Sequence, residues 1–274
     1  MLDLLVHVAN YSAPGAGLRY AAQLNTALGG TLTGVFVAEP IVPLGPAGLT
    51  PVAPQMYAAV AKTVEEARQA EPVFRRWAGE QGVKRFGWQI AHGWFASALA
   101  SAANWHDALV LESGVNAVWG SPGLLGQALV GCGVPCFVLP DDYNGTARLD
   151  TIVLASHGSA EAVRAAHAAL PLLARARRVV LAKGQPRETF SPVAFQPGFT
   201  LEEHLSRHGI AFETRVLEGT DAGMGAEILA AATDVAADLL VLGAFGRTRF
   251  SEWVLGGVTR HMLEHARLPL FFRH

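Results

Sequence analysis

Asp238-Leu-Leu-Val-Leu242 is a short apolar run of strand length, and nearly the same run occurs earlier in the chain as Asp107-Ala-Leu-Val-Leu111. Each run is followed by a helix-length segment and then by a strand led by proline. These later strands are Val134-Pro-Cys-Phe-Val138 and Leu268-Pro-Leu-Phe-Phe272. A match of both sequence and order over one unit indicates an internal repeat. The sequence therefore predicts a tandem duplication.

The same alternation of apolar runs and alanine-rich segments extends along the whole chain. It is typical of βα units built around a parallel sheet, so the predicted fold class is α/β. In the first half we expect strands over 4–8, 33–37, 87–91, 108–111 and 136–139, with helices around 14–28, 55–82, 95–104 and 123–131. In the second half we expect strands over 152–156, 179–182, 214–217, 239–242 and 270–272. Each half thus forms a five-stranded unit.

The boundary between the two units is expected in the segment 140–149, which is polar and rich in turn-forming residues. This places one domain at 1–140 and a second at 150–274. The division agrees with the usual size of a domain, about 150 residues.

Composition and charge exclude several classes of protein. Lysine and arginine total 21 against 23 acidic residues, and a net charge of −2 offers no general attraction to nucleic acid or to an anionic membrane. The uncharged stretches 40–61 and 113–140 are interrupted by prolines and glycines, so neither is expected to span a membrane as a helix. The first residues are typical of a strand and not of a secretory signal, and the expected location is cytoplasmic.

Cys132 and Cys136 are the only cysteines of the chain, and their C-x3-C spacing fits neither a disulfide framework nor a C-x-x-C redox pair. We expect both to be packing residues of the core.

A glycine-rich motif with the spacing G-x2-G-x9-G-G follows the strand 239–242. Its glycines are Gly243, Gly246, Gly256 and Gly257. A loop of this kind, at the carboxyl end of a parallel strand and before a helix, presents backbone N–H groups and a positive helix end to an anion. Arg247 could add a charge-assisted contact and the Thr259 hydroxyl a hydrogen bond at the same rim. We expect glycine to be required here because a Cβ would block positive φ or hold a phosphate away.

The segment 237–274 that contains this motif resembles the closing motif of the universal stress protein (UspA) family. Asp150-Thr-Ile-Val-Leu-Ala-Ser-His-Gly-Ser-Ala-Glu-Ala162 resembles the opening strand and first helix of such a domain. With the duplication, the chain resembles a tandem member of the family. The resemblance implies two Rossmann-like five-stranded parallel sheets of strand order 3-2-1-4-5, with a ligand site between strands 1 and 4.

The resemblance also implies a regulatory protein that binds ATP or ADP, with or without Mg²⁺, in its second half. The residues that it assigns to nucleotide binding are Ala155, Ser156, His157, Leu242, Gly243, Gly246, Arg247, Gly256, Gly257, Val258 and Thr259.

Two positions depart from the family's ATP-binding pattern. Gly257 stands where that pattern has Ser or Thr, and losing one hydroxyl donor costs on the order of 1 kcal/mol. His157 stands where the pattern has an aspartate. An imidazole cannot accept two ribose hydroxyls as a carboxylate does, although its protonated form favours an anion.

The first half departs further. Glu112 occupies the position of the motif's first glycine, and its carboxylate would repel a phosphate. We therefore expect a degenerate copy that packs against the second half. The apolar strand 270–272 would be an edge, and two arrangements would cover it: pairing with 136–139 of the same chain, or pairing in a homodimer.

Two functional readings remain open from the sequence. The first is a nucleotide-dependent switch that acts on an unidentified protein partner, and the second is an interaction module that uses no nucleotide. No catalytic residue is assigned. Slow ATP hydrolysis ranks third among the readings, because no general base and no metal-binding pair of carboxylates can be identified near the loop.

His261-Met-Leu-Glu-His265 and His204-x3-His208 have zinc-like spacings, but no further carboxylate follows His265, and no metal site is expected.

Overall fold

The computed structural model describes residues 1–10, 13–40, 54–113, 122–140, 142–184, 200–219, 223–244 and 256–274. The strands are β1 (Leu4–His7), β2 (Leu32–Ala38), β3 (Phe86–His92), β4 (Ala108–Ser113), β5 (Cys136–Pro140), β6 (Thr151–Ser156), β7 (Arg178–Lys183), β8 (Glu213–Val216), β9 (Leu239–Gly243) and β10 (Leu270–Arg273). The helices are α1 (Ala16–Leu28), α2 (Pro54–Gln69), α3 (Glu71–Glu80), α4 (Phe95–Ala103), α5 (Pro122–Gly131), α6 (Ala160–Leu173), α7 (Leu201–Arg207), α8 (Met224–Asp234) and α9 (Gly257–His265).

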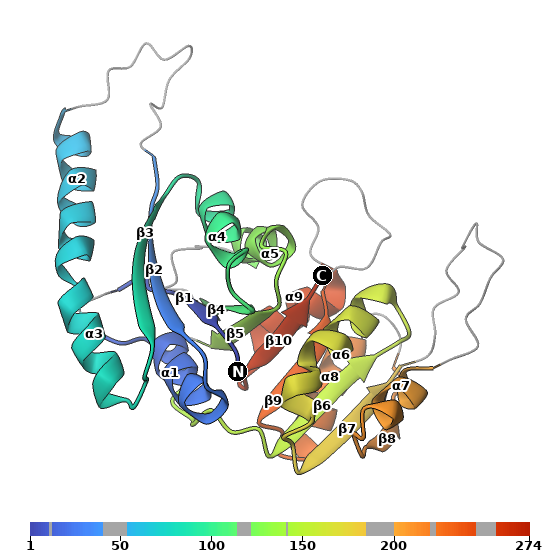
Figure 1. The fold of residues 1–274 in the computed structure, drawn as a ribbon. Coiled ribbons are helices and arrows are strands. Elements are labelled where there is room, and N and C mark those ends of the chain that lie inside the picture. Colours follow the sequence, from blue (N-terminus) through green and yellow to red (C-terminus); the bar gives the residue numbers. More distant parts are fainter. Residues whose placement is uncertain are drawn as a thin grey trace, which may run out of the picture.

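All the strands that we predicted are present, within a residue or two at either end. They form one sheet of order β3-β2-β1-β4-β5-β10-β9-β6-β7-β8 (Figure 1). Counted within its own half, each set has the order 3-2-1-4-5 that the family resemblance implied. Every pairing is parallel except that of β5 with β10.

The antiparallel pair β5–β10 joins the two halves. Phe137 lies opposite Phe271 in the register, and their rings meet edge to face with centroids 4.9 Å apart. The sequence left two arrangements open, and the structure shows the one in which both strands belong to the same chain. Pairing in this way gives each edge strand hydrogen-bond partners that it would otherwise lack.

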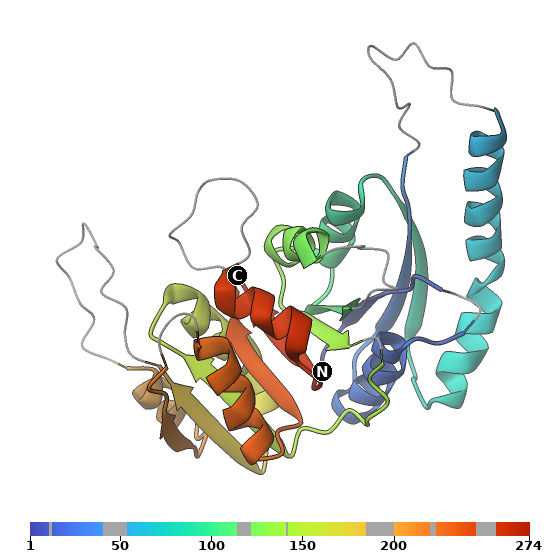
Figure 2. The ribbon, with the colours of Figure 1, turned by 180° about the vertical axis from the view of Figure 1, so that it is seen from behind.

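Helices cover both faces of the sheet. Alternate residues of each strand point to opposite faces, so Ile152 and Leu154 join one core while Val153 and Ala155 join the other. The first core contains residues of α1, α3, α6 and α7, and the second contains residues of α4, α5, α8 and α9. Figure 2 shows α8 and α9 on the face that is turned away in Figure 1. Both cores continue through the β5–β10 pair.

The helix expected over 55–82 is two helices in the structure. Pro72 lies in the first turn of α3, and a proline there has no N–H to donate to the carbonyl four residues before it. The chain turns at Ala70 and resumes as α3, with the Phe74 N–H donating to the Ala70 carbonyl at 2.9 Å. A continuous helix was therefore the wrong prediction.

The repeated aspartate that opens β4 and β9 makes the same contact in both halves. The Asp107 carboxylate accepts from the Asp3 N–H at 2.8 Å, and the Asp238 carboxylate accepts from the Thr151 N–H at 2.9 Å. Each bond ties the start of the fourth strand of its half to the start of the first. This shared contact supports the predicted duplication. Among the described residues, no helix combines the length and the apolar character needed to cross a bilayer.

Candidate functional site

The candidate site lies at the carboxyl end of β6. This strand pairs with β9 on one side and β7 on the other, all three parallel, so their carboxyl ends reach one edge of the sheet. The chain leaves β6 and β9 in opposite directions across the sheet, which is the topological switch point where open α/β sheets bind ligands.

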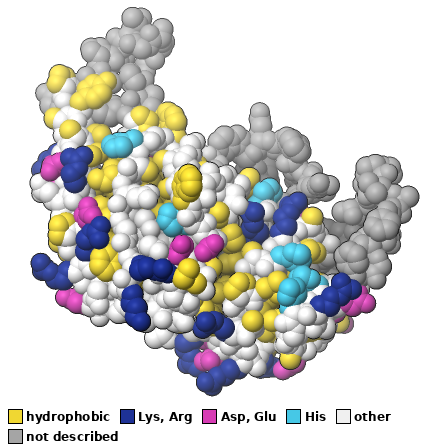
Figure 3. All heavy atoms as spheres, in the orientation of Figure 1, with side chains coloured by type: hydrophobic (Ala, Val, Ile, Leu, Met, Phe, Trp, Pro, Cys, Tyr) yellow, Lys and Arg dark blue, Asp and Glu magenta, His cyan; other side chains and the backbone are white. Residues whose placement is uncertain are grey.

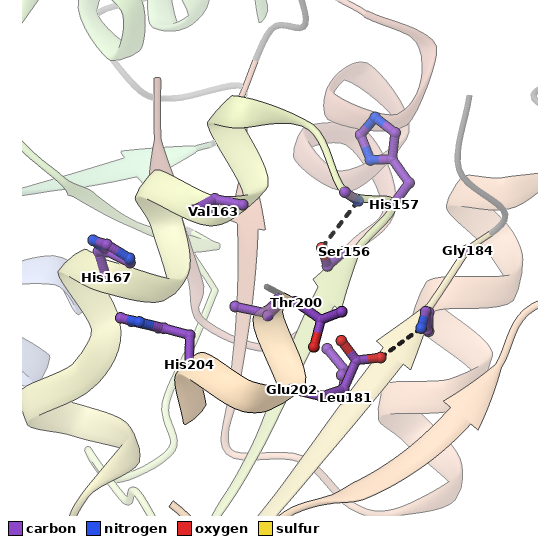
Figure 4. Close-up of a pocket in the computed structure, with 12 residues that line it drawn as sticks. Ser156, His157, Val163, His167, Leu181, Gly184, Thr200, Glu202 and His204 are labelled. Atoms are coloured by element: carbon purple, nitrogen blue, oxygen red, sulfur yellow. Dashed lines mark hydrogen bonds and ion pairs between the residues drawn. The ribbon is translucent and has the colours of Figure 1, made fainter. Parts of the chain in front are cut away.

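A pocket of about 390 Å³ opens beside this edge between β6, β7, α6 and α7 (Figure 4). Its floor includes Ser156, His157 and Gly158 after β6, and Lys183 and Gly184 at the end of β7. The walls are residues of α6 and α7, namely Val163, His167, Thr200, Leu201, Glu202 and His204. A volume of this size lies in the range of small-molecule sites, roughly 300–1,000 Å³.

Local hydrogen bonds set the shape of the pocket. The Gly158 N–H donates to the Ser156 hydroxyl at 3.2 Å, and the Ser159 hydroxyl caps α6 by accepting from the Ala162 N–H at 3.2 Å. On the opposite wall, Thr200 and Glu203 form a capping box that begins α7. The turn after β6 and the start of α7 are therefore defined by side chains of their own segments.

One ion pair lies inside the pocket. The Lys183 ammonium donates to the Glu202 carboxylate at 2.5 Å, and the pair joins the end of β7 to the first turn of α7. The hydrogen bond from Lys183 lowers the pKa of Glu202. Lys183 lies opposite Ser156 in the β6–β7 register, so the pair places a cation and an anion level with the end of β6.

Histidines form the other end of the pocket. His167 of α6 stacks on His204 of α7 with ring centroids 4.1 Å apart, and His208 meets His204 at 4.6 Å. Burial, followed by the electrostatic influence of the neighbouring His167 and His208, lowers the pKa of His204. Figure 3 shows a group of histidine side chains on the surface in the region of α6 and α7. In Figure 4, His157 lies at the end of the pocket opposite His167 and His204.

The structure places the predicted nucleotide residues unequally. Ser156 and His157 line the pocket, whereas Ala155 and Leu242 are buried in the core and offer a ligand only their backbone. Gly256 and Gly257 are exposed at the start of α9, with Val258 half-buried beside them. Thr259 is only 5% exposed, so its hydroxyl does not lie on an open rim. Gly246 and Arg247 lie outside the described residues.

Gly243 is required for a reason that the sequence analysis did not give. None of Gly243, Gly256 and Gly257 has positive φ, so positive φ is not the reason for glycine at these three positions. A Cβ at Gly243 would lie 2.5 Å from the Ala162 nitrogen and 2.6 Å from the Glu161 carbonyl carbon. The glycine therefore allows the end of β9 to approach the first turn of α6 closely.

Glu112 occupies the corresponding place in the first half. Its carboxylate accepts from the Gly17 N–H at 2.7 Å, in the first turn of α1, and it also fills the space beside Gly15. An anion at this point is stabilised by the free N–H groups and the dipole of the helix. The carboxylate thus acts as an internal anion at the start of α1.

The two halves place glycine and glutamate in reciprocal positions. The first has Glu112 at the end of β4 and Gly17 at the second residue of α1. The second has Gly243 at the end of β9 and Glu161 at the second residue of α6, with Glu161 only 5% exposed. In each half, one carboxylate therefore lies where the fourth strand ends beside the first helix. The strand β4 supplies it in the first half, and the helix α6 supplies it in the second.

The zinc-like spacings do not produce a metal site. His261 and His265 stack with centroids 4.2 Å apart instead of converging, and Glu264 pairs with Arg260 at 3.6 Å. Within the part of the chain that the structure describes, no three His, Cys, Asp or Glu side chains gather as metal ligands would.

Half of the pocket consists of residues that were not predicted from the sequence. Lys183 and Gly184 lie at the carboxyl end of β7, next to β6. Ligand sites are expected at the carboxyl ends of parallel strands, so the position of these two residues after a predicted strand could have indicated them. The capping-box spacing of Thr200 and Glu203 was visible as a helix start. Nothing local in the sequence indicates that His167 and His204 meet, because they belong to different helices.

The chain is similar to known proteins both in sequence, over its second half, and in fold. Residues 148–272 match the model of the universal stress protein family. No curated protein matches the chain in sequence. A solved universal stress protein from Archaeoglobus fulgidus superposes with a TM-score of 0.71 and 15% identity, covering 99% of this chain and 96% of that one.

Two further structures share the fold over 99% of this chain, each with 13% identity. A functionally unknown protein from Pseudomonas aeruginosa gives a TM-score of 0.53 with 92% of its chain covered. The cytoplasmic domain of a prokaryotic cation chloride cotransporter gives 0.52 with 94% covered. At this identity the likeness concerns the fold alone.

Proposed function

We propose that the second half, whose residues 148–272 match the model of the universal stress protein family, binds ATP or ADP as a ligand-dependent regulatory switch. The observation that carries the proposal is the pocket at the carboxyl ends of β6 and β7. The glycines that begin α9 follow β9, the strand that pairs with β6 on its other side. The base and ribose would enter the pocket, and the phosphates would meet the start of α9.

The exposed turn at Gly256 and Gly257 supports the proposed position of the phosphates at the start of α9. No side chain caps α9 in the described structure, and a Cβ at either glycine would meet nothing within 4 Å. The first N–H groups of a helix without a side-chain cap can donate to an anion, and the helix dipole favours its charge. Lys183 supplies a cation at the same edge of the sheet.

The volume and the mixed apolar and polar lining of the pocket support the proposed position of the base and ribose. Leu181, Val163 and the His204 ring give apolar and aromatic surface, while Ser156 and Thr200 bring hydroxyl groups. The ribose aspartate of the family pattern has no counterpart, so we expect weaker binding than in a domain that has it. We assign no protein ligand to Mg²⁺. Glu202, which lines the pocket, pairs with Lys183, and Glu161 in the first turn of α6 is buried and is not part of the lining.

Calorimetric titration of the full chain with Mg-ATP tests the proposal. Gly257→Asp adds a carboxylate at the start of α9, where the side chain has open space and a helix tolerates acid well. We expect saturable binding near one site per chain in the wild type and at least a tenfold loss in the variant. Gly79→Asp is the matched control, since its Cβ also meets nothing within 4 Å but lies in the first half.

Gly257→Ser provides the opposite test. It restores the hydroxyl that the family's ATP-binding pattern has here, and one added hydrogen bond of about 1 kcal/mol would tighten binding about fivefold. The absence of binding at millimolar nucleotide in both the wild type and Gly257→Ser would contradict the proposal. The alternative, an interaction module without nucleotide, would then explain the domain.

A further inference from the structure

The end of α5 brings together the only two cysteines of the chain. Cys132 follows the helix and Cys136 begins β5, and their sulfur atoms lie 3.1 Å apart in a thiol hydrogen bond. A disulfide has a sulfur–sulfur length of about 2.05 Å, so closing the bond needs a movement of roughly 1 Å. The C-x3-C spacing alone did not predict this proximity, because it depends on the turn between helix and strand.

The two sulfurs have unequal acidity. The pKa of Cys132 is lowered to about 7, chiefly because the Cys136 thiol donates a hydrogen bond that favours the Cys132 thiolate, and Arg273 on β10 adds a smaller effect of the same sign. The pKa of Cys136 is raised because it is the donor and is fully buried. A nucleophilic thiolate beside a protonated thiol is the arrangement in which one cysteine reacts and the other resolves the product.

The surroundings allow a small oxidant to reach the pair through local opening. Each cysteine is 1% exposed in the closed structure. Gly126 lies in the interior of α5, where glycine costs about 1 kcal/mol relative to alanine, and Gly131 is the last residue of the helix. A Cβ at Gly131 would meet nothing within 4 Å, and Gly133 has φ of +65°. Glycines thus stand on both sides of Cys132, and local opening of this segment would expose the pair to an oxidant.

We propose that Cys132 and Cys136 form a redox-active dithiol that a hydroperoxide converts to an intramolecular disulfide. The Cys132 thiolate attacks the peroxide oxygen, the O–O bond breaks, and the alkoxide or hydroxide released takes up a proton, which leaves Cys132 as a sulfenic acid. The Cys136 sulfur then attacks the Cys132 sulfur, and water leaves with the Cys136 proton. Two thiols lose two electrons in total, and one peroxide is reduced to an alcohol or water and a further water.

The position of the pair connects this chemistry to the rest of the fold. Cys136 lies opposite Phe272 in the β5–β10 register, so the disulfide would form at the joint between the two halves. Helix α5 also contacts α9, whose first residue is Gly257. The inference stands without the proposed nucleotide function, because it rests only on the two cysteines and their neighbours.

Hydrogen peroxide added to the reduced full chain tests the inference. We expect loss of both thiols, a mass lower by two hydrogens, a monomer on a non-reducing gel, and full recovery with dithiothreitol. In Cys136→Ser we expect a Cys132 sulfenic acid that dimedone traps, and in Cys132→Ser we expect at least a tenfold slower reaction at pH 7. Retention of both thiols, sulfinic acid without a disulfide, or a disulfide-linked dimer would each overturn the inference.

The pH profile of the wild-type reaction decides the matter if a variant fails to fold. A thiol with pKa near 7 is about half ionised at pH 7, whereas one at 9 is about 1% ionised, so the rate should level off above about pH 8. A rate that continues to rise about tenfold per pH unit through pH 9 would overturn the assignment of Cys132 as the reacting thiolate.

Discussion

Replacement of Glu112 tests the assignment of its carboxylate as an internal anion at the start of α1. Glu112→Gln keeps the shape and the acceptor oxygen, which receives the Gly17 N–H at 2.7 Å, but removes the charge. A hydrogen bond to a charged group contributes about 1.5–3 kcal/mol and a neutral one about 0.5–1.5, and the helix dipole adds about 0.3–1. We therefore expect the free energy of unfolding to fall by about 1–2 kcal/mol. Glu112→Ala removes the acceptor as well and should cost about 2–3 kcal/mol.

Urea unfolding followed by circular dichroism measures these differences, and hydrogen exchange at the Gly17 amide locates them. The amide should exchange about tenfold faster in Glu112→Gln, since 1.4 kcal/mol corresponds to a factor of ten in an opening equilibrium. Glu80→Gln is the matched control, because Glu80 is exposed at the end of α3 and should change stability by less than about 0.5 kcal/mol. Equal stability of the Glu112 and Glu80 variants, with unchanged exchange at Gly17, would refute the reasoning.

Three further predictions concern other parts of the fold. Gly243→Ala should lower stability by roughly 1–3 kcal/mol in thermal unfolding, because its Cβ would lie 2.5 Å from the Ala162 nitrogen, and a variant as stable as the wild type would contradict this packing. Burial lowers the pKa of His7 from 6.5 to about 3, so the unfolded chain takes up the proton first and stability should fall as pH drops from 6.5 towards 3, by at most about 1.4 kcal/mol per pH unit. In His7→Leu the free energy of unfolding should depend less steeply on pH over this range, and an unchanged dependence would contradict the prediction. Glu202→Gln should change stability by less than about 1 kcal/mol and, by freeing Lys183 and removing a charge, tighten Mg-ATP binding about fivefold in calorimetry, whereas weaker binding would place the phosphates elsewhere.

The sequence by itself determined the fold class, the positions of the strands and the existence of two similar halves. These features depend on the order of apolar and polar residues along short segments, which is visible in runs such as Asp238-Leu-Leu-Val-Leu242. The strand order came from the family resemblance, which the motif after β9 carried. The expected helix over 55–82 is broken at Ala70, two residues before Pro72, so this exception has a local cause that the sequence contains.

Only the tertiary structure decided which distant residues meet. Gly17 and Glu112 are 95 positions apart and become neighbours because β4 lies beside β1, after which α1 begins. The pairing of β5 with β10 within one chain, and the contact of His167 with His204, depend in the same way on how whole elements pack. A local pattern specifies which face of a strand or helix is apolar, but the partner of that face is set by the packing of the complete sheet and its helices.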